Sequence, residues 1–312
     1  MKSNKKFLQF IAAVAILMFH LWIPCTGSEI ESFIIKTAYI GVDLFFFVSA
    51  YSLADKDILL KDFYINRFFT IYVKFVLFVI IAAIYKGMTT IKVIKVLTLV
   101  DFFERGGGAF LWFIPAILIF YVLYPLFIRW DNKYKIVIVI IAWFIISTLV
   151  ENIIGYNKIY IFTNRIPVLL LGYILKKNNI PGVISAICLP VGIVVTYILG
   201  YRYRLNIPFT EIYFVTGIFT VVGLYGISKF VKTSKLWDIL SSGTLELYAI
   251  QMIFGVKIVT EIHNLIRNNL VTNIIMIISL FGMSIIFSNI YKMIIDVLRK
   301  IVENRHNYGR KK

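Results

Sequence analysis

The sequence predicts an all-α membrane protein, a polytopic bundle of about ten transmembrane helices with both termini in the cytoplasm. Three observations support this. Hydrophobic residues make up 60% of the 312 residues, the mean hydropathy is +0.86, and apolar runs approach the roughly 20 residues that cross a bilayer. The net charge of +17 is spread over short groups between these runs. We therefore expect no soluble domain and no nucleic-acid partner.

The apolar runs define ten candidate spans within a single integral-membrane domain, residues 1–312. Residues 91–103 are apolar as well, but Lys92, Lys95 and the short length favour a helix at the membrane interface. If that segment crossed the membrane, every later span would be inverted. The spans are 7–24, 37–54, 68–85, 109–128, 136–151, 162–175, 183–200, 209–228, 240–258 and 271–291.

The distribution of lysine and arginine predicts the orientation of the spans. Cytoplasmic segments of membrane proteins carry an excess of basic residues, and with the N-terminus inside, the outer segments here carry about half as many as the inner ones. We therefore expect a multi-pass protein of the cytoplasmic membrane. The inner residues are Lys2, Lys5, Lys6, Lys56, Lys61, Arg67, Arg129, Lys133, Lys135, Lys176, Lys177, Lys229, Lys232, Lys235 and the tail from Lys292 to Lys312.

The N-terminal residues 1–19 imitate a secretory signal, with a basic start and an apolar core, but no small-residue cleavage site follows. We interpret them as part of the first span, retained in the mature protein. Cys25 and Cys188 lie far apart and fit no metal-ligand spacing. We therefore expect neither a disulfide framework nor a metal site.

A histidine and an aspartate lie within the first two spans, where ionisable side chains are costly and usually mark a pathway or a site. At 1.5 Å per residue, His20 lies roughly 20 Å above the inner surface and Asp43 roughly 10 Å below the outer one, which are similar depths. Spans joined by a short loop normally pack side by side. We therefore predict a hydrogen bond from His20 to Asp43, which would make the imidazole a stronger base. The alternative is an ordinary interfacial histidine.

Three residues at the ends of spans are further candidates. Arg67, at the inner start of the third span, is either a membrane anchor or a phosphate contact, because guanidinium pairs bidentately with phosphate oxygens. Trp112, which follows three glycines, is either an aromatic at the outer interface or part of a site. Arg165 lies at an outer helix start, where the helix dipole disfavours a cation. It therefore needs a partner, for which Glu151 and Glu211 are available.

The late stretch SSGTLELYAIQMIFG carries a polar stripe into the membrane. Four small or polar residues recur at helical spacing along it. Such a stripe either forms hydrogen bonds between helices or lines a path through the bundle. Its members are Thr244, Tyr248, Gln251 and Gly255.

Taken in order, six stretches of this chain resemble the acyltransferase 3 family, integral-membrane enzymes that transfer acyl groups to surface polysaccharides and related acceptors. Each fragment alone is a weak signal. Six in the expected order, from residue 16 to residue 252, cover essentially the whole transmembrane core. The stretches are ILMFHLW, GVDLFFFVSAYSLA, FYINRFFTIY, LWFIPAILIFYVLYPLF, RIPVLLLGYIL and TLELYAIQM.

The resemblance implies an O-acyltransferase that moves an acetyl or other short acyl group from acyl-CoA to a sugar hydroxyl. The acceptor would be a capsular, exopolysaccharide or other cell-envelope glycan, or a lipid-linked oligosaccharide. Acetyl-CoA or another acyl-CoA would be a donor substrate, with no tightly bound cofactor. The lipid bilayer is the remaining expected partner, and the sequence does not indicate an oligomeric state.

The resemblance also assigns roles to residues. His20 corresponds to the family's catalytic histidine, and Arg67 to an arginine thought to act with the acyl donor. This chain departs from the common pattern at four positions, so that Gln251, for example, cannot be a general base. The departures are Thr70 for a second arginine, Val73 for a proline, Ala50 for a glycine and Gln251 for a histidine.

These residues together predict a transfer mechanism with two ends. Arg67 and Lys61 would bind the phosphates of the donor, and His20, oriented by Asp43, would deprotonate the sugar hydroxyl. Arg67 and His20 fall on opposite sides of the midplane, so transfer would be either direct or through a covalent acyl-enzyme. The residues expected along the acceptor path are Trp112, Arg165, Tyr248 and Gln251.

Two other classes of function are compatible with the sequence. One is a transporter or flippase of lipid-linked sugars, in which His20 and Asp43 would form a proton-coupling pair. Such a protein should show paired half-helices or an inverted repeat, and we find neither in the sequence. The other is a noncatalytic membrane partner of a polysaccharide machine.

Overall fold

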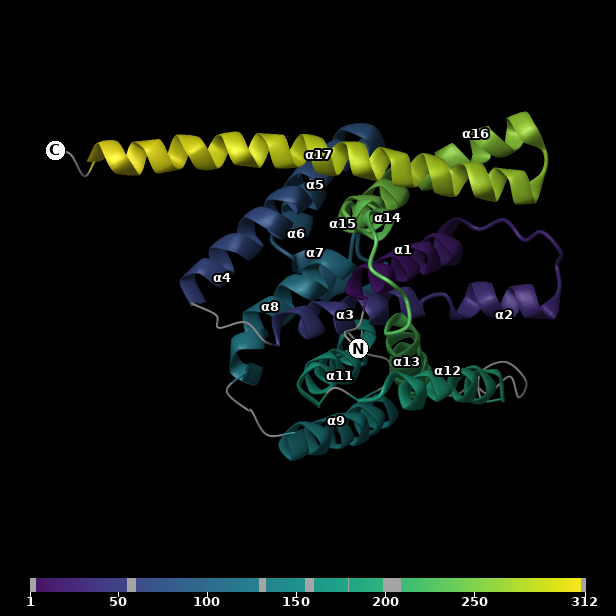
Figure 1. Ribbon diagram of the computed structural model, residues 1–312. Helices are drawn as coiled ribbons and strands as arrows, with labels where there is room; N and C mark the ends of the chain where they lie inside the picture. The colour runs from purple at the N-terminus through teal and green to yellow at the C-terminus, as the bar shows by residue number, and fades with distance from the viewer. Residues whose placement is uncertain are drawn as a thin grey trace.

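The computed structural model describes residues 4–54, 60–128, 133–154, 160–178, 180–198 and 209–309, which form helices and their connections without a strand. The long helix α17 runs along one side of the bundle and α9 lies on the opposite side, with α1 and α3 between them (Figure 1). The predicted all-α class is confirmed. The elements are α1 (Lys5–Leu21), α2 (Glu29–Thr37), α3 (Ile40–Leu53), α4 (Leu60–Arg67), the π-helical η1 (Phe68–Tyr72), α5 (Val73–Lys86), α6 (Thr90–Leu97), α7 (Val100–Arg105), the 3₁₀ turn η2 (Gly106–Gly108), α8 (Phe113–Ile128), α9 (Lys133–Ile154), α10 (Tyr160–Thr163), α11 (Ile166–Asn178), α12 (Gly182–Thr196), α13 (Phe209–Ser228), α14 (Lys235–Ser241), α15 (Thr244–Ile250), the π-helical η4 (Gln251–Gly255), α16 (Val256–Ile266) and α17 (Asn269–Gly309).

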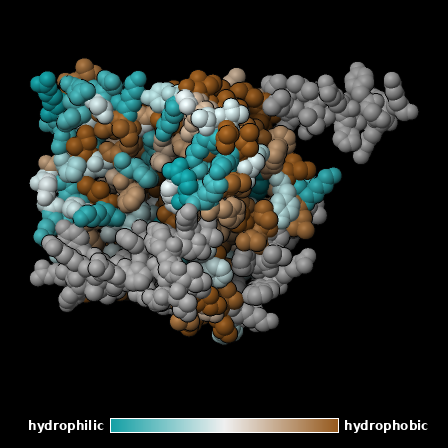
Figure 2. All heavy atoms as spheres, turned by 180° about the vertical axis from the view of Figure 1, so that it is seen from behind, coloured by the Kyte–Doolittle hydropathy of each residue, from teal (hydrophilic) through white to brown (hydrophobic). Residues whose placement is uncertain are grey.

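Four helical stretches of the described chain are long and apolar enough to cross a membrane. They overlap the second, third, ninth and tenth predicted spans, and each of the other six predicted spans also overlaps a helix. Many large apolar side chains are exposed on the outside of the molecule, and Figure 2 shows patches of hydrophobic residues beside hydrophilic ones on one face. Ten spans and cytoplasmic termini stay predictions. The four stretches are Glu29–Leu53, Leu60–Lys86, Lys235–Ile266 and Asn269–Asp296, and shorter apolar helices cover Phe113–Tyr124, Gly182–Thr196 and Val215–Ser228.

The helical stretch that corresponds to the second predicted span begins at Glu29, about two turns before the predicted start at residue 37. Ser28 caps it, because its side chain accepts a hydrogen bond from the amide of Glu31 at 3.2 Å. The Glu31 carboxylate in turn accepts hydrogen bonds from the amides of Cys25 and Thr26, both at 2.7 Å, and of Gly27 at 3.0 Å. Ser-x-x-Glu is the sequence pattern of a capping box. Asp43 consequently lies about 21 Å from the start of this stretch at Glu29, whereas the predicted start at residue 37 placed it about 10 Å from the outer surface.

Residues 91–103 form two short helices instead of a crossing. α6 and α7 are 8 and 6 residues long, so each is only about 9 to 12 Å in length and too short for the bilayer core. The chain turns between them at Leu99, whose φ is +64°. The prediction that this segment does not cross agrees with these lengths.

α3 lies at the centre of the bundle, packed by α1, α11 and α13. Glycines bring the helices into close contact with it, as small residues do in membrane helix pairs. A Cβ atom at Gly41 of α3 would lie 2.4 Å from the Ala12 carbonyl oxygen of α1, and one at Gly172 of α11 would lie 2.4 Å from the Phe47 carbonyl oxygen of α3. Most side chains of α3 are buried, which is why its sequence is hydrophobic on nearly all faces apart from Asp43 and two serines.

The contact at Gly172 can be tested by substitution. We expect Gly172→Ala to lower the free energy of unfolding in detergent by about 1–3 kcal/mol, because the added methyl group meets backbone that cannot move aside. Gly282→Ala is the matched control, since nothing lies within 4 Å of its Cβ position in α17. The control should be neutral or more stable by up to about 1 kcal/mol, the helix-propensity difference. Equal stabilities of the two variants would contradict this packing.

Candidate functional site

Asp43 forms an ion pair with Arg165 rather than the predicted hydrogen bond with His20. The Arg165 Nε and Asp43 Oδ1 atoms are 3.2 Å apart, and the two side chains are 3% and 2% exposed. The predicted His20–Asp43 pair is wrong because the helices are offset. Gly41 packs beside Ala12, which lies eight residues, or about 12 Å, before His20 along α1.

His20 lies in the last turn of α1, with an exposed side chain. Its ring contacts Phe19 edge-on, with 5.1 Å between the ring centroids. Leu21, the next residue, lies against Gly255, where an added Cβ would come within 2.6 Å of a Leu21 methyl carbon. His20 is therefore accessible at one end of the bundle and close to the end of the π-helical segment η4.

The Asp43–Arg165 pair is enclosed by aromatic and polar groups. The guanidinium lies over the ring of Trp112, 5.5 Å from its centroid, and also donates to the carbonyl oxygen of Ile161. The second carboxylate oxygen, Oδ2, has no hydrogen-bond partner among the described residues. The sequence suggested Glu151 or Glu211 as the partner of Arg165, but both side chains lie outside the described residues. Asp43 meets the requirement that a buried cation be paired.

Trp112 reaches this pair from a loop that other residues fix. The Asp101 carboxylate accepts a hydrogen bond from the Phe110 amide at 3.1 Å and forms an ion pair with Lys92. Leu111 adopts a φ of +55°, an unusual conformation for a side chain of this size. Trp112 is only 7% exposed, so it lies within the bundle and not among the surface aromatics of a membrane interface.

Tyr248 and Gln251 extend this region from the other side. The Tyr248 hydroxyl accepts a hydrogen bond from the amide of Phe113, the residue after Trp112, at 3.4 Å. Gln251 is 3% exposed, and neither amide atom has a hydrogen-bond partner among the described residues. Gln251 also begins the π-helical segment η4, and such segments are frequent at functional sites. A buried amide without a partner is costly, so Gln251 is well suited to bind a polar group that enters the bundle.

Arg67 and Lys61 lie on α4, away from the residues above. The Arg67 guanidinium lies 5.3 Å from the Phe63 ring centroid and 4.4 Å from that of Tyr121 in α8, which are cation–π distances. Its Nε has no hydrogen-bond partner among the described residues. Lys61 is exposed and six residues away, so it lies about 120° around the helix from Arg67. In Figure 1, α4 and the connection from α1 to α2 are at opposite ends of the bundle.

The structure also contains a buried ion pair that the sequence reasoning missed, between Lys74 of α5 and Glu246 of α15. Both residues lie within predicted spans, at 68–85 and 240–258. Ionisable side chains within a span usually mark a pathway or a site, and this signal, which identified His20 and Asp43, could have identified this pair as well. Among the described residues, no group of three or more His, Cys, Asp or Glu side chains could hold a metal ion.

The comparisons with known proteins identify a family for this chain. A family model described as an acyltransferase domain matches residues 6–292, nearly the whole chain. No curated protein and no solved structure matches the sequence. The matched region includes Asp43, Arg165, Trp112 and the polar stripe of α15 and η4. The chain therefore belongs to the acyltransferase 3 family and is a membrane acyltransferase.

Proposed function

We propose that the protein transfers an acetyl or other short acyl group from acyl-CoA to a hydroxyl of a cell-envelope glycan, in the bacterial cytoplasmic membrane. The observation that carries this proposal is the acyltransferase match over residues 6–292. The exposed imidazole of His20 supports it, because a general base must be reachable by the hydroxyl that it deprotonates.

In the proposed reaction, His20 takes the proton of the acceptor hydroxyl. The hydroxyl oxygen attacks the thioester carbonyl carbon and forms the new ester bond, while the carbon–sulfur bond breaks. The thiolate of CoA then receives the proton from the imidazolium, so the histidine returns to its starting state. Because Asp43 is paired with Arg165, His20 acts here without a carboxylate partner.

The donor end of the reaction is proposed at Arg67 and Lys61. Aromatic rings hold the Arg67 guanidinium, which leaves its planar edge of donors suited to phosphate oxygens. The residues proposed to line the acceptor path are Trp112, Arg165, Tyr248 and Gln251. The transporter alternative depended on a His20–Asp43 proton-coupling pair, and we do not pursue it because Asp43 is paired with Arg165.

The proposal is tested with purified protein, acyl-CoA labelled in the acyl group and a lipid-linked glycan in vesicles. We expect the label to appear in ester linkage on the glycan only when the protein is present. Movement of the glycan across the vesicle membrane without label transfer would instead indicate a transporter. With the acceptor omitted, label that stays on the protein indicates a covalent acyl-enzyme, whereas an unlabelled protein indicates direct transfer.

A further inference from the structure

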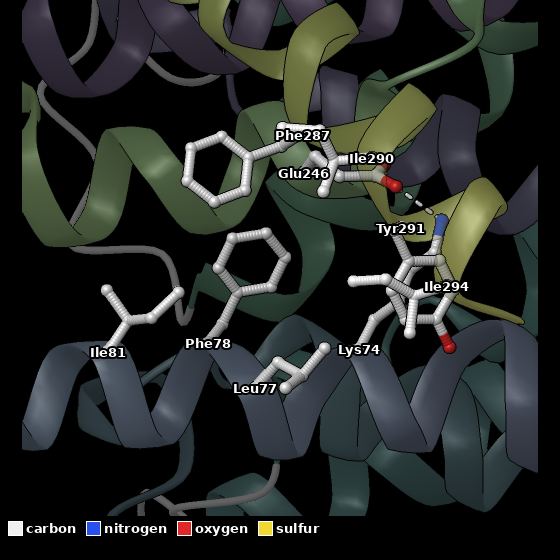
Figure 3. A pocket seen from close by; sticks show the side chains of 9 residues that line it. All are labelled: Lys74, Leu77, Phe78, Ile81, Glu246, Phe287, Ile290, Tyr291 and Ile294. Atoms are coloured by element: carbon white, nitrogen blue, oxygen red, sulfur yellow. Dashed lines mark hydrogen bonds and ion pairs between the residues drawn. The ribbon is translucent and has the colours of Figure 1, made fainter.

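A pocket of about 130 Å³ lies between α5, α15 and α17. Lys74, Leu77, Phe78 and Ile81 line it from α5, at positions i, i+3, i+4 and i+7 of one helical face. Phe287, Ile290, Tyr291 and Ile294 repeat this spacing on α17, and Glu246 completes the wall from α15 (Figure 3). The pocket is therefore a groove about 10 Å long between two helices, with mostly apolar walls.

The two ends of the groove differ in polarity. In Figure 3, the side chains of Ile81, Phe78 and Phe287 lie toward one end, and those of Lys74, Tyr291 and Ile294 toward the other. The Lys74 ammonium is paired with Glu246 and lies 4.8 Å from the Tyr291 ring centroid. The Lys74 side chain is 16% exposed and that of Glu246 only 2%. The more accessible member of the pair is thus the cation.

The π-helical segment η1 turns Lys74 toward this groove. Residues 67 and 74 would share one face of a regular α-helix, but a π-helical turn takes up an extra residue and rotates the rest of the helix about its axis. Arg67 accordingly contacts Tyr121 of α8, while Lys74 contacts α15 and α17. The groove and the proposed donor end therefore lie on different faces of the α4–α5 helix.

The surroundings of the groove indicate its occupant. Two walls, α5 and α17, belong to stretches long and apolar enough to cross a membrane, so the hydrocarbon of the bilayer is the phase in contact with it. Asp296, Arg299 and Lys300 follow Ile294 in the sequence, which places the polar end nearer the membrane surface. The sequence beyond it is rich in lysine and arginine up to Lys312. Basic residues beside a span attract anionic headgroups.

We propose that this groove binds an acyl chain of an anionic bilayer phospholipid, with the chain along Phe78, Ile81 and Phe287 and the headgroup beyond Ile294. Glu246 of the wall is two residues from Tyr248 on α15. A bound chain would therefore also support the helix that carries the polar stripe. The binding itself does not depend on the proposed acyl transfer.

The test uses the full-length protein in vesicles with phosphatidylglycerol that carries a photoreactive group in its acyl chain. After irradiation, we expect most of the label on residues 77–81 of α5 and 287–294 of α17. Ile274 and Ile278, which are also on α17 and are exposed, should carry much less label. Ile81→Trp should reduce this labelling roughly tenfold by displacing about two CH₂ groups. Ile80→Trp is the matched control, because Ile80 is 45% exposed and does not line the groove.

Each of the following outcomes would overturn the proposal. Even labelling along α17 would show that the groove is not a site, and this readout does not require a folded variant. Equal labelling of the two tryptophan variants would show that the lipid acyl chain lies elsewhere.

The preference for an anionic headgroup is tested with a second lipid. We expect phosphatidylglycerol to label the groove roughly fivefold more strongly than phosphatidylcholine does. Equal labelling by the two lipids, or displacement by polyprenyl phosphate at a small molar fraction, would rule out an anionic phospholipid as the occupant. None of these measurements uses acyl transfer, so a failure here is distinct from a failure of the proposed activity.

Discussion

Replacing His20 by alanine is expected to slow acyl transfer by roughly 10²- to 10⁴-fold, the usual contribution of a positioned general base. The fold should change little, because the side chain is exposed at the end of α1 and has no hydrogen bond to a described residue that the substitution would remove. The measurement is the rate at which labelled acyl groups reach the glycan, with the unfolding midpoint in detergent determined in parallel.

His263→Ala is the control for this experiment. His263 lies in the last turns of α16, 3.4 Å from the Thr272 hydroxyl through its Nδ1 atom, and has no part in the proposed reaction. We expect its transfer rate to equal that of the unaltered protein. A His20→Ala protein that transfers acyl groups at the original rate would refute the assignment of His20 as the base.

Breaking the Asp43–Arg165 pair from either side is expected to be the most destabilising single change. Asp43→Leu leaves a buried guanidinium without its counter-ion, and Arg165→Met leaves a buried carboxylate, each at a cost of about 3–5 kcal/mol. Both side chains are almost fully enclosed, so solvent screening is weak. The measurement is the free energy of unfolding in detergent for each single variant and for the double variant.

The double variant separates structure from function at this pair. Removing both charges leaves no unpaired ion, so we expect its stability to return most of the way to that of the unaltered protein. If the guanidinium over Trp112 contributes to the reaction path, acyl transfer stays lost in the double variant. Recovery of both stability and transfer would limit the pair to a structural role, and additive losses would contradict the ion pair itself.

The order of the six motifs, the helical class and the approximate positions of the helices could all be read from the sequence. These properties are local, since a run of apolar residues at helical length or a short motif keeps its meaning whatever its neighbours are. The start of the helical stretch Glu29–Leu53 could also have been predicted from the sequence, because Ser28 and Glu31 form the Ser-x-x-Glu pattern that precedes the apolar run. Placing that start at residue 37 displaced Asp43 along the helix and produced the wrong partner for His20.

Residue partners were decided only by the tertiary structure. The sequence identified Asp43 and Arg165 as ionisable residues that required partners, but it offered several of opposite charge. The offset between α1 and α3, set by the close approach of Gly41 to Ala12, brings Asp43 to Arg165 instead of His20. In the same way, one π-helical segment turns Lys74 toward Glu246 and away from the face of Arg67. Hydropathy and motifs specify which residues enter the membrane, whereas the contacts between them depend on the rotation and offset of packed helices.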